Sequence, residues 1–80
     1  MADAGEMPQV LQTLKIGRSV QVRVSIERER GRFRLVVREH YRGADSKWRP
    51  AQTALHLWEE QLPEFIAALI EASDVLAGEA

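Results

Sequence analysis

The residues of this 80-residue chain that could do chemistry are two histidines, His40 and His56, and a large set of arginines. The chain has no cysteine, which excludes thiolate catalysis and sulfur-ligated zinc sites. Neither histidine has a paired acid at the spacing of a metal site or a general base, and the sequence holds no nucleophile motif and no glycine-rich phosphate loop. We therefore expect no catalytic activity, no bound metal and no cofactor.

The charge of the chain is segregated along its length. All eleven basic residues lie between Lys15 and Arg49, where only four acidic residues occur, so this segment carries a net charge of +7. The flanking segments hold eight acidic residues and no basic one, which brings the whole chain to −1. Such a distribution indicates a surface that faces a polyanion, with acidic flanks.

Strands must position most of these arginines. Apolar and polar residues alternate strictly from Val20 to Ile26, which predicts a strand, and Gly31 permits the short turn that follows. A second strand is expected over about Arg32–Tyr41. Shorter strands are expected at Lys47–Arg49 and Thr53–Leu57, with an irregular edge strand around Val10–Ile16.

An amphipathic helix closes the chain. Its apolar stripe has helical spacing and consists of Leu62, Phe65, Ile66, Leu69 and Ile70. Pro63 fits only the first turn, so the helix should begin near Gln61–Leu62, and Gly78 should end it. The fold class is therefore α+β, a curved four-stranded antiparallel sheet followed by one C-terminal helix. We divide the chain into a disordered acidic tail (1–8), a single domain (9–77) and a short tail (78–80).

One helix can cover one face of such a sheet, and we expect it to cover the apolar face. The opposite face then carries Arg23, Arg32, Arg34 and Arg38. An antiparallel sheet often has a merely solvated polar face, but this one is nearly of one sign, its cations are arginines, and Tyr41 and Trp48 lie at its margin. Guanidinium groups bind phosphates and aromatic rings stack on unpaired bases, so this face is typical of a single-strand-binding surface. The alternative is a protein-interaction or assembly module whose arginine face binds an acidic partner.

The segment from Ile16 to about Ala72 resembles the single-stranded-DNA-binding domain of the transcriptional Positive Cofactor Four coactivator family, in particular its bacterial and phage members. The resemblance rests on Ile16-Gly17 before the first long strand, on the hairpin at Arg30-Gly31-Arg32, and on Arg38-Glu39-His40-Tyr41 at the end of the second strand. It continues with Trp48-Arg49-Pro50, with the strand Leu55-His56-Leu57, and with the helix start Glu60-Gln61-Leu62. A Pur-like repeat that binds RNA or DNA has a similar pattern of strands and helix, and it is the alternative among nucleic-acid-binding domains.

The resemblance implies a homodimer that binds single-stranded or melted DNA in transcription regulation or DNA maintenance. It gives phosphate-binding roles to Arg18, Arg32, Arg38 and Arg49, and a base-stacking role to Tyr41. Strict alternation instead places Tyr41 on the apolar face, which would make Trp48 the better stacking residue, unless a bulge near Glu39–His40 or strong sheet twist turns Tyr41 toward the arginines. Whether the strand is DNA or RNA stays open.

The small size of the chain also favours a dimer. Eighty residues without disulfides bury a marginal core, so the helix stripe is expected to pack against a second copy. The absence of cysteine and of any apolar run long enough to cross a bilayer predicts a cytoplasmic protein. The implied DNA binding would make it nucleoid-associated.

Overall fold

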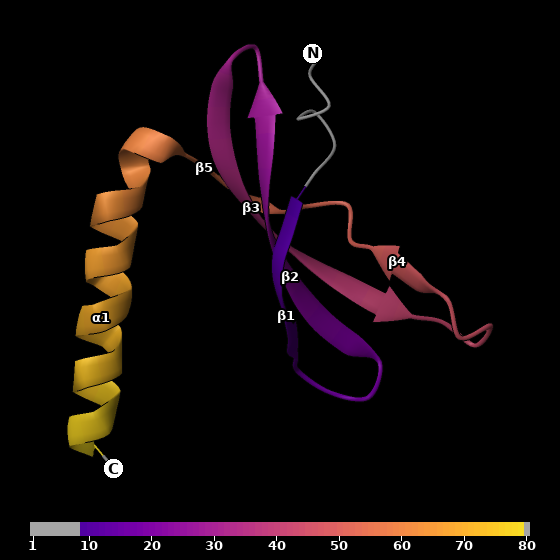
Figure 1. Cartoon of the computed structure of the whole chain (residues 1–80). Coiled ribbons are helices and arrows are strands. Elements are labelled where there is room, and N and C mark those ends of the chain that lie inside the picture. Colours follow the sequence, from indigo (N-terminus) through magenta and orange to yellow (C-terminus); the bar gives the residue numbers. More distant parts are fainter. Residues whose placement is uncertain (1–8, 80) are drawn as a thin grey trace.

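The computed structural model describes residues 9–79, which form an antiparallel sheet followed by one long helix (Figure 1). The elements are β1 (Gln9–Lys15), β2 (Val20–Glu29), β3 (Arg32–Arg42), β4 (Trp48–Pro50), β5 (Leu55–Trp58), the 3₁₀ turn η2 (Glu59–Gln61) and α1 (Leu62–Glu79). The predicted acidic tail, residues 1–8, lies outside the described residues. The helix does not end at Gly78 as expected, because α1 continues through Gly78 to Glu79.

The sheet has the order β1-β2-β3-β4, and β5 also pairs with β3. Both β4 and β5 run antiparallel to β3 along the same edge, so they occupy one strand position, and the sheet is four strands wide. The fold class, a four-stranded antiparallel sheet with a C-terminal helix, is confirmed. The irregular edge strand is β1, whose pairing with β2 shifts register between Val10 and Gln12.

The break between β4 and β5 is a local insertion. His40 pairs with Pro50 and Val37 pairs with Leu55, so the four residues 51–54 face only two residues of β3. Pro50 cannot donate a ladder hydrogen bond, which explains why β4 stops there. The Ala51 amide still donates to the Glu39 carbonyl (2.8 Å), and the remaining residues loop out before pairing resumes.

The hairpin between β2 and β3 is tighter than the sequence pattern suggests. The sequence alternation predicts a turn over Arg28–Gly31, but β2 continues to Glu29 and only Arg30 and Gly31 form the loop. Both have positive φ, 54° at Arg30 and 78° at Gly31. Two successive residues of this kind match the right-handed twist of the flanking strands, so the ladder can extend to the tip.

Paired residues of antiparallel strands share a face of the sheet, and the register therefore separates two faces. The apolar face carries Leu14, Val22, Val24, Leu35, Val37, Leu55 and Leu57. The polar face carries Gln21, Arg23, Ser25, Arg34, Val36, Arg38 and His40. Val36, Gln21 and Ser25 are the buried residues of the described chain, and all three lie on the polar face.

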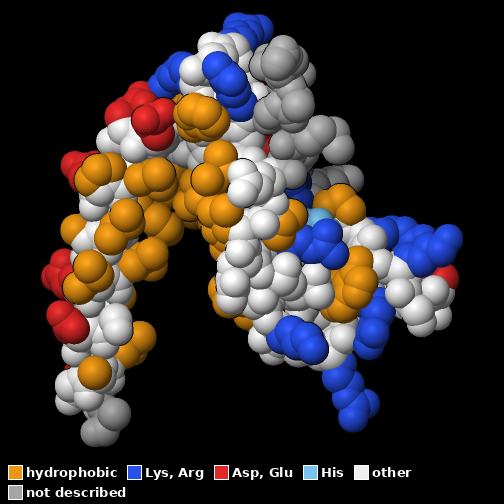
Figure 2. Space-filling view, viewed as in Figure 1, with side chains coloured by type: hydrophobic (Ala, Val, Ile, Leu, Met, Phe, Trp, Pro, Cys, Tyr) orange, Lys and Arg blue, Asp and Glu red, His pale blue; other side chains and the backbone are white. Residues whose placement is uncertain are grey.

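The helix does not cover the apolar face as the sequence analysis expected. The helix stands away from the sheet, so that sheet, connection and helix together form an arch. Figure 2 shows hydrophobic side chains on both inner sides of this arch. These side chains line a groove of about 490 Å³ whose walls come from the sheet (Leu14, Val22, Val24, Leu35, Val37, Leu55) and from the helix (Leu62, Phe65, Ile66, Leu69). Half or more of the surface of Ile66, Leu69 and Ile70 is exposed. The connection through η2 directs the helix away from its own sheet, which sequence periodicity cannot reveal.

The hairpin tip generates a stability prediction. Gly31→Ala should lower the free energy of unfolding by roughly 1 kcal/mol, because an alanine at positive φ is strained even though nothing lies within 4 Å of the added Cβ. Gly78→Ala is the matched control. It also meets no atom within 4 Å, but it lies in α1 and should raise the free energy of unfolding by about 0.5–1 kcal/mol. Urea unfolding measures both, and equal effects of the two substitutions would contradict the prediction.

Candidate nucleic-acid interface

The centre of the polar face is a cavity with two opposed arginines in its wall. Arg23 of β2 and Arg38 of β3 are direct cross-strand partners. Their side chains are half-buried and contribute to a cavity of about 310 Å³. The other lining residues are Val10, Ser25, Glu27, Val36, His40 and Pro50. The alternation of β2 and β3 brings these side chains to one face, and the extended ladder keeps them in fixed register.

Neutral oxygens hold both guanidinium groups in place. Arg23 Nε donates to the Gln21 side-chain oxygen at 2.8 Å. Arg38 Nη1 donates to the Ala51 carbonyl at 2.7 Å and to the Gln52 carbonyl at 3.4 Å, so it clamps the insertion between β4 and β5. Within residues 9–79, no carboxylate forms an ion pair with either arginine. Two like charges directly opposite each other repel, and an anion bound between them would relieve that repulsion.

His40 in this cavity has a lowered pKa, for which burial is the main cause and the neighbouring arginines a further one. Burial lowers the pKa of His40 below its ordinary value of 6.5, and the charges of Arg23 and Arg38 lower it further. A weak contact with the Arg38 carbonyl, 3.4 Å from Nδ1, acts in the other direction without reversing the result. The imidazole is therefore neutral at neutral pH, and the two arginines supply the charge of the cavity.

The hairpin end of the polar face differs, because carboxylates accompany its arginines. Arg34 lies 3.0 Å from Glu27 and 3.1 Å from Glu29. Arg32 lies 2.5 Å from Glu60 of η2, and its guanidinium stacks on the Trp58 ring with 4.0 Å to the ring centroid. Both arginines are predicted from the sequence to bind phosphates. The structure gives them intramolecular partners that a phosphate would have to displace.

Tyr41 and Arg49 lie on the other face of the sheet. They are cross-strand partners, and Tyr41 also pairs with Val20 of the apolar face. The bulge that could have turned Tyr41 toward the arginines is not present, since β2 and β3 pair without a break from Val20–Tyr41 to Glu29–Arg32. The Tyr41 hydroxyl donates to Glu39, which raises its pKa, and Arg49 binds Asp45 at 2.6 Å.

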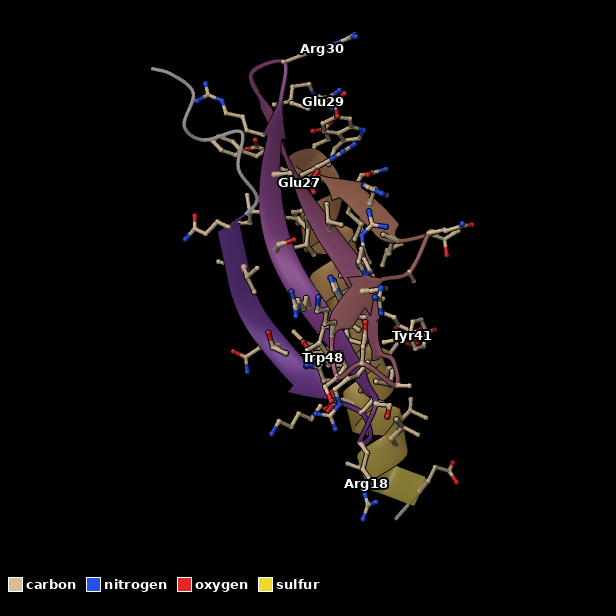
Figure 3. The ribbon with its side chains drawn as sticks, turned by 90° about the vertical axis from the view of Figure 1, so that its right-hand side faces the viewer. Arg18, Glu27, Glu29, Arg30, Tyr41 and Trp48 are labelled. Carbon is tan, nitrogen blue, oxygen red and sulfur yellow. The ribbon has the colours of Figure 1, made fainter. Side chains whose placement is uncertain are left out.

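The polar face carries two tryptophans: Trp58, which pairs with Arg34 and stacks with Arg32, and Trp48. Trp48 pairs with Arg42, whose guanidinium lies 5.4 Å from the centroid of the indole ring. Arg18 lies in the loop between β1 and β2, and Figure 3 shows it at the same end of the sheet as Trp48. Sequence reasoning missed Gln21 and Arg42 as parts of this face. The strand parity that Arg42 shares with Arg38 could have identified it.

Within residues 9–79, no group of three or more histidine or acidic side chains is placed to hold a metal ion. No helix in that part of the chain is both long enough and apolar enough to cross a membrane.

The half-buried His40 leads to a pH prediction. Because the folded chain holds the His40 pKa below 6.5, the unfolded chain binds a proton first on acidification, and folding should weaken as the pH falls below about 6.5. His40→Gln should remove this part of the pH dependence in urea unfolding between about pH 7.5 and 5. His56→Gln, at an exposed position of β5, is the control and should keep it. An unchanged pH dependence in His40→Gln would show that the cavity does not perturb this group.

Comparison with known proteins places the fold. No family model matches the chain, and no curated protein matches its sequence. Among solved structures, the orthorhombic crystal form of a PC4 homologue from Burkholderia pseudomallei matches with a TM-score of 0.73 and 22% identity, covering 89% of this chain and 96% of that one. Its tetragonal form matches with a TM-score of 0.73 and 23% identity, covering 82% and 97%. The chain therefore has the fold of a bacterial PC4 homologue, as the sequence resemblance implied.

Proposed function

We propose that this chain binds single-stranded DNA on the polar face of its sheet. The observation that carries the proposal is the opposed pair Arg23 and Arg38, which line a cavity and have no carboxylate partner within the described residues. A backbone phosphate fits this charge, and guanidinium groups bind phosphate oxygens in bidentate geometry. Trp48 on the same face offers a ring for an unpaired base.

Single strands suit this face better than duplex DNA does. A duplex hides the faces of its bases inside the stack, so no base could stack on the Trp48 ring. A single strand can place a base on this ring while its phosphates reach the arginines. Phosphates and ring faces are common to all sequences, so binding should tolerate any base sequence. The PC4-like fold supports a role in transcription regulation or DNA maintenance.

We also propose that the protein is a homodimer. The apolar groove between helix and sheet is open in a single chain, and the exposed stripe of α1 has the same apolar character as the sheet face opposite it. A second copy could insert its helix into this groove and accept the first helix in return, which is the self-complementary contact that a two-fold axis requires. The proposed interface residues are Leu62, Phe65, Ile66, Leu69 and Ile70.

The dimer prediction uses matched charge insertions. Leu69→Glu places a carboxylate in the apolar groove and should convert the dimer into an unfolded or aggregating monomer. Ala67→Glu places the same carboxylate beside Glu71, away from the stripe, and should remain dimeric. Light scattering with chromatography measures the mass of each. A well-folded wild-type monomer at micromolar concentration would contradict the proposal.

The binding prediction concerns salt dependence. If about four phosphates are neutralised per protomer, the log–log slope of affinity against salt should be about −3 per protomer for a single strand. Arg23→Gln should weaken binding to all sequences alike and flatten the slope by about 0.7, because it removes one phosphate contact. Arg30→Gln, which removes an equal charge from the hairpin tip, should leave affinity and slope close to wild type.

Fluorescence anisotropy with matched single-stranded and duplex oligonucleotides measures these effects. The duplex should bind more weakly at each salt concentration. Equal affinity for both, or an Arg23→Gln chain that binds as tightly as wild type, would favour the alternative in which the arginine face meets an acidic protein.

A further inference from the structure

A second cavity lies at the end of the polar face farther from the hairpin tip. It has a volume of about 260 Å³ and is lined by Lys15, Gly17, Arg18, Gln21, Arg42 and Trp48. The end of β1, the loop after it, β2, β3 and β4 all contribute residues to it. Figure 3 shows Arg18 and Trp48 toward this end of the molecule and Glu27, Glu29 and Arg30 at the other. The chain thus brings a ring and several cations together from separate segments.

The charge of this cavity is not compensated by its own lining. Lys15, Arg18 and Arg42 are cations, and none of the lining residues is acidic. The nearby carboxylate of Asp45 binds Arg49 at 2.6 Å and also accepts from the Lys47 amide at 3.0 Å. Arg49 lowers the pKa of Asp45, so that carboxylate stays ionised and occupied by its own partners. At the hairpin end, by contrast, carboxylates accompany Arg32 and Arg34.

The walls of the cavity are tied together before any ligand binds. The Arg42 backbone amide donates to the Ser19 carbonyl at 2.9 Å, and the Arg42 side-chain Nη2 donates to the Arg18 carbonyl at 3.1 Å. Arg42 therefore holds the loop between β1 and β2 with both its backbone and its side chain. The same guanidinium lies over the Trp48 ring, which is half-buried. A ring held in this way loses little freedom when a flat ligand stacks on it.

Gln21 connects this cavity with the one between Arg23 and Arg38. Its side chain lines the second cavity, and its oxygen accepts from Arg23 Nε, which lines the first. Gln21 is 8% exposed, so this bridge is a fixed part of the sheet. A nucleic-acid strand that extends from the first cavity past Gln21 therefore reaches Trp48 directly. In that direction it moves away from Glu27 and Glu29.

We infer that the second cavity is a nucleotide subsite, in which one base stacks on Trp48 and the adjoining phosphate binds Lys15 and Arg18. This inference rests on the proposed function and adds a path to it. The bound DNA strand runs from the Arg23–Arg38 cavity past Gln21 to Trp48, and the hairpin end, where carboxylates pair with Arg32 and Arg34, stays outside the path. Arg42 orients the ring and adds a third charge.

The test uses Trp48 as its own reporter. In a Trp58→Phe chain, Trp48 is the sole tryptophan, since the sequence contains two. Labelled oligothymidylate is titrated and followed by anisotropy, while unlabelled oligothymidylate is followed by Trp48 fluorescence. We expect the fluorescence to be quenched with the same midpoint as the anisotropy change. Trp48→Ala should weaken binding about 5- to 100-fold with little change in salt slope, and Trp48→Phe should recover most of that loss.

The charged wall is tested separately. Arg18→Gln should flatten the salt slope by about 0.7, whereas Arg30→Gln should not. Circular dichroism checks that each variant is folded, and if Trp48→Ala is not, the quenching in the Trp58→Phe chain decides the question. Saturated binding that leaves Trp48 fluorescence and the Arg18→Gln slope unchanged would overturn the subsite and leave the proposed function standing. A wild-type chain that fails to bind oligothymidylate would overturn the proposed function and the subsite with it.

Discussion

The uninterrupted pairing of β2 with β3 is the constraint on which the rest of this structure depends. Ten consecutive residues of β2 face ten of β3, from Val20–Tyr41 to Glu29–Arg32. Because successive side chains of a strand point to opposite faces, a shift of one residue would exchange the two faces of the whole sheet. The register places Arg23 opposite Arg38, keeps Tyr41 with Val20, and leaves Val36 at the base of a polar cavity rather than in an apolar core. The two-residue turn at the tip sets that register, since it leaves no slack between the strands.

The arginines of the polar face divide according to their partners. Arg32 and Arg34 have carboxylates beside them, and Arg32 also joins the hairpin to η2 through Glu60 and the Trp58 ring. An exposed ion pair such as Arg32–Glu60 contributes little to stability by itself. This pair nevertheless joins the sheet to the turn before the helix, and so helps to set the direction in which α1 leaves the sheet. Arg23 and Arg38 are held by neutral oxygens, which fix their geometry without cancelling their charge. Arg23 and Arg38 thus keep their charge available to a ligand, whereas Arg32 and Arg34 are paired with carboxylates.

Much of the fold, but less of the site, could be predicted from the sequence. The period-two alternation from Val20 to Ile26 and the helical spacing of Leu62 and Leu69 are local signals, and both elements form where they were expected. The shared strand position of β4 and β5 depends on the connection 51–54, whose two extra residues can be recognised only against the partner strand β3. The ion pairs of Arg34 depend on where Glu27 and Glu29 fall across a turn. Strand parity did predict the face of Tyr41, and the structure resolves that alternative in favour of the apolar side.

The two faces of the sheet differ in how far a single chain buries them. A small domain normally buries its apolar face. In residues 9–79 of this chain the buried residues are instead Gln21, Ser25 and Val36, all on the polar face, while the apolar groove is open. The polar face is therefore complete within one chain, with its arginines already oriented by Gln21 and by the Ala51 carbonyl. The apolar face requires a further surface to exclude water from it. Because β2 and β3 contribute to both faces, packing on the apolar side would stiffen the ladder that holds Arg23 and Arg38, and the proposed dimer would then support the geometry that the proposed phosphate site requires.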